Sequence, residues 1–353
     1  MVSELTSMMN TGLSLTSVDP TELMTTSPTN QTTGSSVTSS SSLDGSFYFQ
    51  CAVVVIGVVG AAANGFILYA MVASKQHKKH ILIFNQNLLD FATCIFLSAS
   101  YLANLANTNL ERAGGYWLCL TLLSDGPGWS TFLGSLINLA AITIERYLKV
   151  VHPALAKKKL RKWMIYSAAT FAWIGGTAVA ASVTITTSNV VNGICYALIF
   201  WKSRTVQMAF GIWYFLSFFV IILLIFIFFY WRILVAIRHQ AKVMAAHGAS
   251  GSSTAPQSRS KQIQTSIIKT MMLVSVIFVI TWAPAMIYYL MLNIYSKFTI
   301  RYSAFYAALF IGHFYLCINP FIYTVNFDPV RQVVIGLITR KKTSQAPERI
   351  EMP

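Results

Sequence analysis

One stretch of the chain, Trp117 to Pro153, reads WLCLTLLSDGPGWSTFLGSLINLAAITIERYLKVVHP. Its middle holds no charged residue between Asp125 and Glu145. A helix rises about 1.5 Å per residue, so this uncharged interval covers roughly 28 Å, close to the thickness of the hydrocarbon core of a bilayer. The stretch therefore predicts a membrane-spanning helix with a Glu-Arg pair at one end.

The rest of the chain has the same character. Of its 353 residues, 55% are hydrophobic and 10% are charged, whereas a soluble domain carries about 25% charged residues. Continuous apolar runs predict helices and not the alternating strands of a membrane barrel. We therefore expect an all-α membrane protein whose seven-transmembrane-helix bundle occupies residues 47–326. Its predicted spans lie near 47–73, 81–104, 117–151, 163–186, 206–237, 263–292 and 302–326.

The loops between these spans differ in their content of basic residues. Lys and Arg gather at 75–79, 157–162, 232–261 and 340–342, whereas the opposite loops carry five such residues and the N-terminal tail carries none. Because basic loops remain in the cytoplasm, we expect a multi-pass plasma-membrane protein with an extracellular N-terminus. The net charge of +15 lies in short runs and not on a soluble basic face. We therefore expect contact with anionic membrane lipid and no nucleic-acid partner.

The two ends of the chain differ from the spans in composition. Residues 1–46 are rich in Ser and Thr and lack an apolar signal segment, so we expect a disordered extracellular tail with a glycosylation site at Asn30. An Asp-Pro pair suits the first turn of a helix, and it opens a predicted amphipathic interfacial helix on the cytoplasmic side, at 327–338. Residues 339–353 are predicted to form a disordered cytoplasmic tail.

Polar residues and prolines recur inside the spans in a fixed order. Because polar groups are costly inside a membrane, each of them is a candidate functional residue. They are Asn64, Asp90, Glu145-Arg146-Tyr147, Trp173, Trp282-Ala283-Pro284 and Asn319-Pro320-x-x-Tyr323. This set resembles the helix signatures of the rhodopsin-like (class A) G-protein-coupled receptors, and the resemblance covers residues 47–337.

The resemblance implies a receptor without enzymatic activity that binds an extracellular ligand, moves helix six and promotes nucleotide exchange on a heterotrimeric G protein. Pro284 removes a backbone donor and can kink this helix, so a small rotation near Trp282 becomes a larger cytoplasmic movement. The toggle residues implied are Phe278, Trp282 and Pro284. The G-protein switch implied consists of Glu145, Arg146, Tyr147, Tyr230, Asn319, Pro320 and Tyr323.

The resemblance also implies a sodium ion at the centre of the bundle. Three residues offer oxygen ligands there, namely Asp90, Ser135 and Asn319. A hydrogen-bonded polar cluster without an ion is the alternative. No other metal and no cofactor is expected.

Five cysteines allow at most one bridge on the oxidising side, because only Cys119 and Cys195 lie near loops there. The resemblance implies that these two pair. Cys119 lies slightly further from Arg146 than the family spacing, and an irregular turn near Asp125-Gly126-Pro127-Gly128 would absorb the extra length.

The ligand class is constrained by what the spans lack. Retinal receptors use a lysine in span seven, and residues 302–326 contain none, so an opsin is excluded. Amine receptors carry an aspartate on the pocket face of helix three; by family spacing that slot is Gly128, and Asp125 would substitute only if the helix start shifts. An amine is therefore disfavoured, and we expect a peptide or another small ligand. The predicted pocket residues are Asp125, Gly128, Trp129, Phe132, Tyr288, Tyr289, Phe310 and His313.

A seven-helix transporter or pump is the alternative function. A pump needs a chain of acids or a Schiff-base lysine through the membrane, and Asp90 with the terminal Glu145 does not form one. A transporter shows inverted repeats, and no internal repeat is evident in the sequence. A membrane hydrolase needs clustered metal ligands or a nucleophile at depth, whereas the membrane histidine, His313, is solitary.

Two departures from the family pattern concern the helices that move. Span five has no proline between residues 206 and 230, which leaves the shape of this wall of the pocket open. No Asp or Glu occurs between Glu145 and Asp328. Arg146 therefore has no acidic partner on helices five or six.

We predict from this gap a weak inactive-state latch and raised basal signalling. Cells that express the receptor without added ligand are expected to signal above cells that express an Arg146→Ala variant, because a released guanidinium contacts the inserting partner. The measurement is second-messenger output at equal surface expression. Equal output from the two receptors would contradict the prediction.

Overall fold

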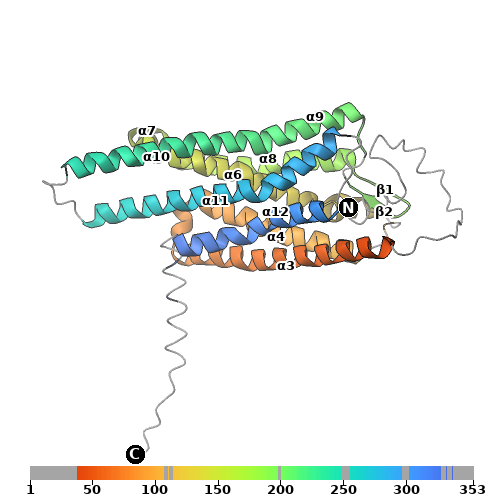
Figure 1. The fold of residues 1–353 in the computed structure, drawn as a ribbon. Helices are drawn as coiled ribbons and strands as arrows, with labels where there is room; N and C mark the ends of the chain where they lie inside the picture. The colour runs from red at the N-terminus through yellow and green to blue at the C-terminus, as the bar shows by residue number, and fades with distance from the viewer. Residues whose placement is uncertain are drawn as a thin grey trace, which may run out of the picture.

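A computed structural model gives the fold and describes residues 38–106, 110, 114–197, 200–247, 255–295, 302–326, 331 and 336. Long helices run side by side and form an elongated bundle (Figure 1). In chain order they are α3 (Thr38–Ala73), α4 (Ile81–Leu105), α6 (Gly126–Val151), α8 (Lys162–Thr187), α9 (Arg204–Phe215), α10 (Ile221–His247), α11 (Ala255–Ile294) and α12 (Tyr302–Asn326). The shorter elements are η1 (Gln76–Lys78), α5 (Gly115–Leu118), η2 (Cys119–Leu123), α7 (Pro153–Lys159), β1 (Asn189–Val191), β2 (Ile194–Tyr196) and η3 (Leu216–Val220).

The bundle buries polar side chains together with its apolar core and exposes many large apolar ones. Ile280 is 65% exposed and Phe171 is 64% exposed, whereas Asn64, Asp90 and Asn319 are fully buried. This distribution suits a lipid solvent, in which every polar group needs a partner within the protein. Six helical segments within the described part of the chain are long and apolar enough to cross a membrane by length and composition alone. The remaining span, α6, is richer in glycine and in polar residues, and its neighbours bury most of them.

Helix three is not one regular helix, and the predicted continuous span at 117–151 is wrong in this respect. The chain passes from α5 through the π-helix η2, and Asp125 then adopts a left-handed conformation with φ of 56° before α6 begins. The predicted irregular turn near Asp125 is confirmed. The wider π turn and the left-handed residue together absorb the extra length that separates Cys119 from Arg146.

Helix five is continuous from α9 to α10, but a π-helical turn, η3, interrupts its regular geometry at Leu216–Val220. Helix five, which forms one wall of the pocket, therefore has an irregular turn although it lacks the proline of the family pattern. Helices five and six also extend beyond the predicted spans, to His247 and from Ala255. Hydropathy locates only the apolar part of each helix, so the predicted spans are shorter than the helices.

The closest approach of two spans joins α6 to α8. A Cβ at Gly176 would lie 2.9 Å from the Cα of Gly134 and closer still to the backbone at Ser130, and a Cβ at Gly134 would lie 2.9 Å from the carbonyl oxygen of Ala172. Small residues allow two backbones to come this near within a membrane, where van der Waals packing is a main source of helix association. This contact fixes helix three against helix four.

Several predictions fall outside the described residues. They are the N-terminal tail with Asn30 as far as residue 37, the tail at 339–353 and the interfacial helix at 327–338, of which only Arg331 and Gly336 are described, both as helical. The predicted disordered tail extends to residue 46, and this is wrong for its last residues, because α3 already begins at Thr38. Tyr323 belongs to α12, but its side chain lies outside what is described.

The α6–α8 contact generates a stability prediction. Gly176→Ala is expected to lower the free energy of unfolding by about 1–3 kcal/mol, because its methyl group meets backbone atoms that cannot move aside. The matched control is Gly175→Ala, whose methyl group would meet the flexible end of Ile137 at 3.1 Å. The measurement is thermal unfolding in detergent. A midpoint for Gly176→Ala as high as that of the control would refute the packing argument.

Candidate functional site

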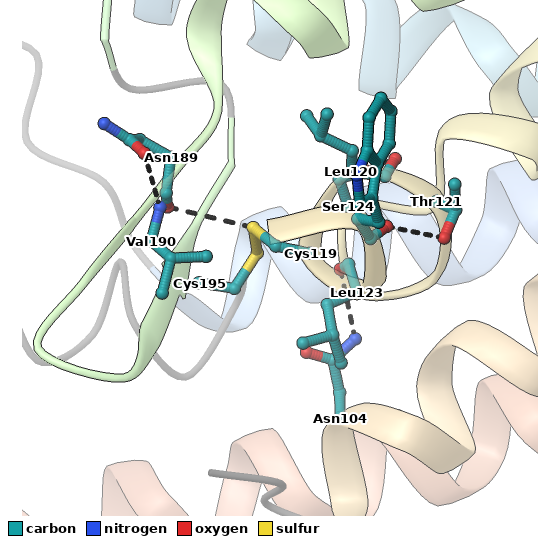
Figure 2. The surroundings of a disulfide bond; sticks show 10 residues. Asn104, Cys119, Leu120, Thr121, Leu123, Ser124, Asn189, Val190 and Cys195 are labelled. Atoms are coloured by element: carbon teal, nitrogen blue, oxygen red, sulfur yellow. Dashed lines mark hydrogen bonds between the residues drawn. A yellow bond between two sulfur atoms is a disulfide. The ribbon is translucent and has the colours of Figure 1, made fainter. Parts of the chain in front are cut away.

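A disulfide closes one end of the bundle. Cys119 in η2 and Cys195 in β2 form the predicted bridge, with their Cα atoms 5.3 Å apart (Figure 2). Strands β1 and β2 form a hairpin whose turn uses left-handed residues, Asn192 and Gly193, as an Asn-Gly turn requires. The bridge therefore fixes this hairpin to the start of helix three. The hairpin lies at the opposite end of the bundle from α7 and from the ends of α10 and α11 that join through the third inner loop (Figure 1).

A cavity of about 130 Å³ opens near the disulfide end. Its described lining comes from α3, α4, η2, α6, α8, α9, α11 and α12, so every span contributes to it. Among the predicted pocket residues, Asp125, Trp129, Tyr289 and His313 line it, together with Trp282. Such a site, apolar with a few polar groups that converge, is typical of ligand-binding cavities.

Four predicted pocket residues occupy other places. Phe132 lies against Trp282, with the ring centres 4.2 Å apart, and Tyr288 packs on Phe305 between α11 and α12. Gly128 lies beneath the carboxylate of Asp125. The prediction for Phe310 differs most from the structure, because this ring is 38% exposed and stacks on Phe314 on the outer surface. The apolar character of α12 does not indicate which of its faces points into the bundle.

Further lining residues were missed by the sequence analysis. Five of them are polar residues inside the predicted spans, namely Gln50, Ser100, Asn104, Ser124 and Thr184. The cost of polar groups in a membrane is the signal that would have found them. The missed aromatic residues are Tyr101, Phe210, Tyr214 and Phe305, and they carry no signal that separates them from core residues.

Asp125 has an unusual position in the cavity. Its left-handed backbone turns the side chain over the next turn of the chain, where a Cβ at Gly128 would collide with the carboxylate. Asp125 Oδ1 is buried and has no hydrogen-bond partner among the described residues. A buried carboxylate oxygen that lacks a partner carries a large desolvation penalty.

His313 offers a second polar group to the cavity. Its Nδ1 lies 2.7 Å from the carbonyl oxygen of Leu309. A carbonyl only accepts, so Nδ1 carries the hydrogen, and Nε2 of the neutral ring is an acceptor. The ring lies edge-on to Trp282, 5.8 Å away, and to Tyr101, 6.3 Å away.

Aromatic contacts continue from the floor of the cavity toward the other end of the bundle. Phe278 lies one turn below Trp282 on α11, is fully buried, and contacts Phe226 at 6.4 Å and Tyr315 at 5.6 Å. Phe226 in turn contacts Tyr230 at 6.1 Å. Pro284 and Pro320 lie within the helices α11 and α12. The predicted toggle residues Trp282 and Phe278 therefore lie one turn apart on α11, between the cavity and Tyr230.

Tyr230 ends this path in a cluster of hydroxyl groups. Its hydroxyl lies 3.2 Å from Thr143 Oγ1 on α6 and 3.1 Å from Ser275 Oγ on α11. The three side chains are buried. One hydroxyl of helix five thus connects helix three to helix six.

Arg146 lies about one turn after Thr143 on α6, toward the end that is remote from the disulfide. Its Nη2 is 3.6 Å from Glu145 Oε2. The same carboxylate also forms an ion pair with Lys149, whose Nζ lies 2.5 Å from Oε1. Arg146 Nε and Nη2 are buried and make no hydrogen bond to the described residues. Burial and the nearby Arg146 lower the pKa of His80 to about 4, so this neighbour is neutral at physiological pH. Tyr147 points to His152, with 3.2 Å between its hydroxyl and Nε2.

The polar residues in the centre form a directed relay of hydrogen bonds. Trp173 Nε1 donates to Asn85 Oδ1, Asn85 Nδ2 donates to Asn138 Oδ1, and Asn138 Nδ2 donates to Gln86 Oε1, each at 2.9 Å. An indole nitrogen only donates, so it fixes the orientation of each following amide. The relay therefore presents the amide nitrogen of Gln86 to the carboxylate of Asp90.

All described hydrogen-bond partners of the Asp90 carboxylate are donors. Ser135 Oγ donates to Oδ1 at 2.6 Å, Asn319 Nδ2 donates to Oδ2 at 3.0 Å, and Gln86 Nε2 lies 3.3 and 3.4 Å from the two oxygens. Gln86 Nε2 also contacts Ser135 Oγ. The predicted sodium residues Asp90, Ser135 and Asn319 thus meet in one cluster, together with a glutamine that the sequence analysis did not include.

Comparison with protein families identifies the chain. Residues 63–323 match the family of 7 transmembrane receptors (rhodopsin family). The match covers most of the chain and contains the cavity, the relay and the Arg146 region, so the protein belongs to this family of membrane receptors. A search of curated proteins finds no match.

The cluster around Asp90 does not fit a sodium ion in this arrangement. Hard cations are held by several oxygen ligands. An amide N–H group has no lone pair to give, and here it lies between the Asp90 and Ser135 oxygens. The Gln86 side chain thus supplies to the carboxylate the positive end of a dipole in place of an ion.

A cluster that binds sodium and a hydrogen-bonded cluster without an ion differ in how the thermal stability of the protein responds to sodium. We expect the midpoint of thermal unfolding to be the same in sodium chloride and in the chloride of a large organic cation. Gln86→Leu removes the donor, and we expect this variant to gain a sodium-dependent rise in the midpoint. Asp90→Asn in the Gln86→Leu background is the control and should abolish the gain. A sodium response of the unaltered receptor would show that the ion binds despite Gln86.

Proposed function

We propose that the protein is a plasma-membrane receptor that binds an extracellular ligand in the cavity and activates heterotrimeric G proteins through movement of α11. The observation that carries this proposal is the position of Trp282, at the floor of the cavity, one turn from Phe278 on α11. The ring of Phe278 contacts Phe226, which contacts Tyr230 beside the Arg146 region. A ligand that displaces Trp282 would press on the same helix that carries Ser275. The N-terminus is then extracellular and the basic loops are cytoplasmic.

Pro284 supplies the hinge for this movement. It lies inside α11, two residues after Trp282, and it removes one backbone hydrogen bond of the helix. Bending at such a point costs less than bending a regular helix. The cytoplasmic part of α11 can then swing away from α6 and open a site in which Arg146 meets the G protein.

The resting receptor holds α11 by hydroxyl contacts and not by an ionic latch. Arg146 has no acidic partner other than Glu145 among the described residues, and Glu145 is shared with Lys149. The contact from Tyr230 to Ser275 is the described side-chain hydrogen bond between helices five and six at this level. A neutral hydrogen bond contributes about 0.5–1.5 kcal/mol, so the latch is weak.

No observation favours a pump or transporter. The titratable groups of the described spans do not form a chain across the bundle, because Asp90 and Glu145 are separated by the relay and by the apolar core. The hydrogen bonds of the relay also join four spans, α4, α6, α8 and α12. Such a rigid centre suits a receptor in which one helix moves against a fixed body.

The decisive experiment measures nucleotide exchange on purified heterotrimeric G proteins with the receptor in lipid vesicles. Exchange above that of empty vesicles, lost on Arg146→Ala, is the result we expect even without ligand. Ser275→Ala is expected to raise basal exchange about 2- to 10-fold, because it removes one hydrogen bond that holds α11 in the resting position.

Thr281→Ala provides the matched control. Thr281 is a buried hydroxyl residue of the same helix, and its described hydrogen bonds stay within that helix. Its basal exchange should equal that of the unaltered receptor. If Ser275→Ala behaved in the same way as this control, the hydroxyl latch would be excluded, whereas absent exchange with every G protein would exclude the proposed function.

A further inference from the structure

We propose that Lys149 is a positioning residue that holds the carboxylate of Glu145 away from Arg146 and so leaves the Arg146 guanidinium free for the G protein. This inference rests on the proposed function, because it takes Arg146 to be the group that meets the G protein. Lys149 itself lies outside the Glu145-Arg146-Tyr147 motif, four residues after its acid.

The carboxylate of Glu145 has one close partner and one distant partner. Lys149 Nζ lies 2.5 Å from Oε1 and donates a hydrogen bond to it, whereas Arg146 Nη2 lies 3.6 Å from Oε2. Hydrogen bonds between nitrogen and oxygen span about 2.7–3.2 Å, so the arginine is near the carboxylate but is not hydrogen-bonded to it. The acid of the motif is therefore bonded to the lysine and not to its neighbour in the sequence.

The geometry of α6 favours the lysine. Glu145 and Lys149 are separated by one helical turn, and the acid precedes the base, which is the better order for such a pair. Residues that follow each other directly point about 100° apart around a helix. The lysine thus reaches the carboxylate along one face of α6, whereas Arg146 has to reach it from a neighbouring face.

The arginine keeps one edge of its guanidinium unpaired. The side chains of Arg146 and Glu145 are 6% and 7% exposed, whereas that of Lys149 is 32% exposed. Arg146 Nε and Nη2 are buried and make no hydrogen bond to the described residues. These two nitrogens form one edge of the guanidinium, and such an edge matches the two oxygens of a carboxylate. It would close on Glu145 if Lys149 released Oε1.

No other described group takes the place of either partner. Burial and the neighbouring Arg146 lower the pKa of His80 to about 4, so this ring is uncharged at neutral pH and does not compete for the carboxylate. No Asp or Glu follows in the sequence before Asp328, so helices five and six offer Arg146 no second acid. Lys149 therefore decides whether Arg146 is paired.

The experiment removes the ammonium group and measures basal nucleotide exchange on purified G proteins with the receptor in lipid vesicles. Lys149→Met is expected to lower basal exchange about 3- to 10-fold, because Glu145 then pairs with Arg146. Lys149→Arg keeps a cation beside the carboxylate and should retain the basal exchange. Lys78→Met is the matched control, since it removes one charge from an exposed lysine of η1 and should leave basal exchange unchanged.

A second background separates positioning from a merely structural role. In Glu145→Gln the carboxylate is absent, so adding Lys149→Met should leave exchange as it is in Glu145→Gln alone. A lysine that only stabilises α6, or that only attracts the G protein, would lower exchange equally in both backgrounds. That result, or unchanged exchange in Lys149→Met alone, would overturn the inference.

A readout without the G protein follows the arginine itself. The ¹⁵N NMR signal of the Arg146 Nε–H group, assigned by its loss in Arg146→Lys, reports whether this group is hydrogen-bonded. Its exchange with water should slow at least about 10-fold in Lys149→Met, as for a hydrogen bond to a charged acceptor. The slowing should be absent when Glu145→Gln is added. An exchange rate in Lys149→Met equal to that of the unaltered receptor contradicts the inference.

The two proposals fail in different ways. If the Arg146 signal is protected in Lys149→Met but no G protein responds to any variant, the positioning role is correct and the proposed signalling is wrong. If G proteins respond to the receptor and the Arg146 signal is the same in Lys149→Met, the role of Lys149 is wrong and the proposed function stands.

Discussion

The requirement that buried polar groups find partners inside the protein governs this structure, because lipid offers none. The relay from Trp173 to Asp90, with Asn319 as a further donor to Asp90, meets that requirement by connecting four spans. Each of its three amide side chains, Asn85, Asn138 and Gln86, both donates and accepts, so the centre of the bundle is rigid and specific. No described hydrogen bond of the relay reaches helix six. This helix contacts helix seven through the rings of Phe278 and Tyr315, and helix five through the hydroxyl groups of Ser275 and Tyr230.

The irregular turns of the backbone lie in the half of the bundle that forms the cavity. The π-helices η2 and η3 and the left-handed Asp125 fall on helices three and five, on either side of the ligand space. A π turn adds a residue to a helix and re-aims the side chains that follow. Beyond these turns both helices continue as regular α-helices, α6 and α10. The protein therefore shapes its cavity by local backbone geometry.

The sequence predicted the features that depend on composition and order. Long apolar runs located every span, and the two cysteines near loops form the expected bridge. The orientation inferred from the basic loops stays a prediction. Rotation and local winding escaped prediction, because hydropathy does not change when a helix turns by one residue. Phe310 was therefore placed in the pocket although it faces outward, and Tyr101 was missed although it lines the cavity. Gln86 was missed since its role depends on the orientation of neighbouring amides.

Because the relay has a direction, a residue that is two hydrogen bonds away can decide whether a donor or an acceptor faces the Asp90 carboxylate. If Asn138 became an acid, its new oxygen would face the oxygen of Gln86, and the Gln86 amide would have to turn around to avoid the repulsion. Its oxygen would then face the carboxylate of Asp90. An ionised acid at position 138 of helix three would in this way replace the donor that faces Asp90 by an acceptor.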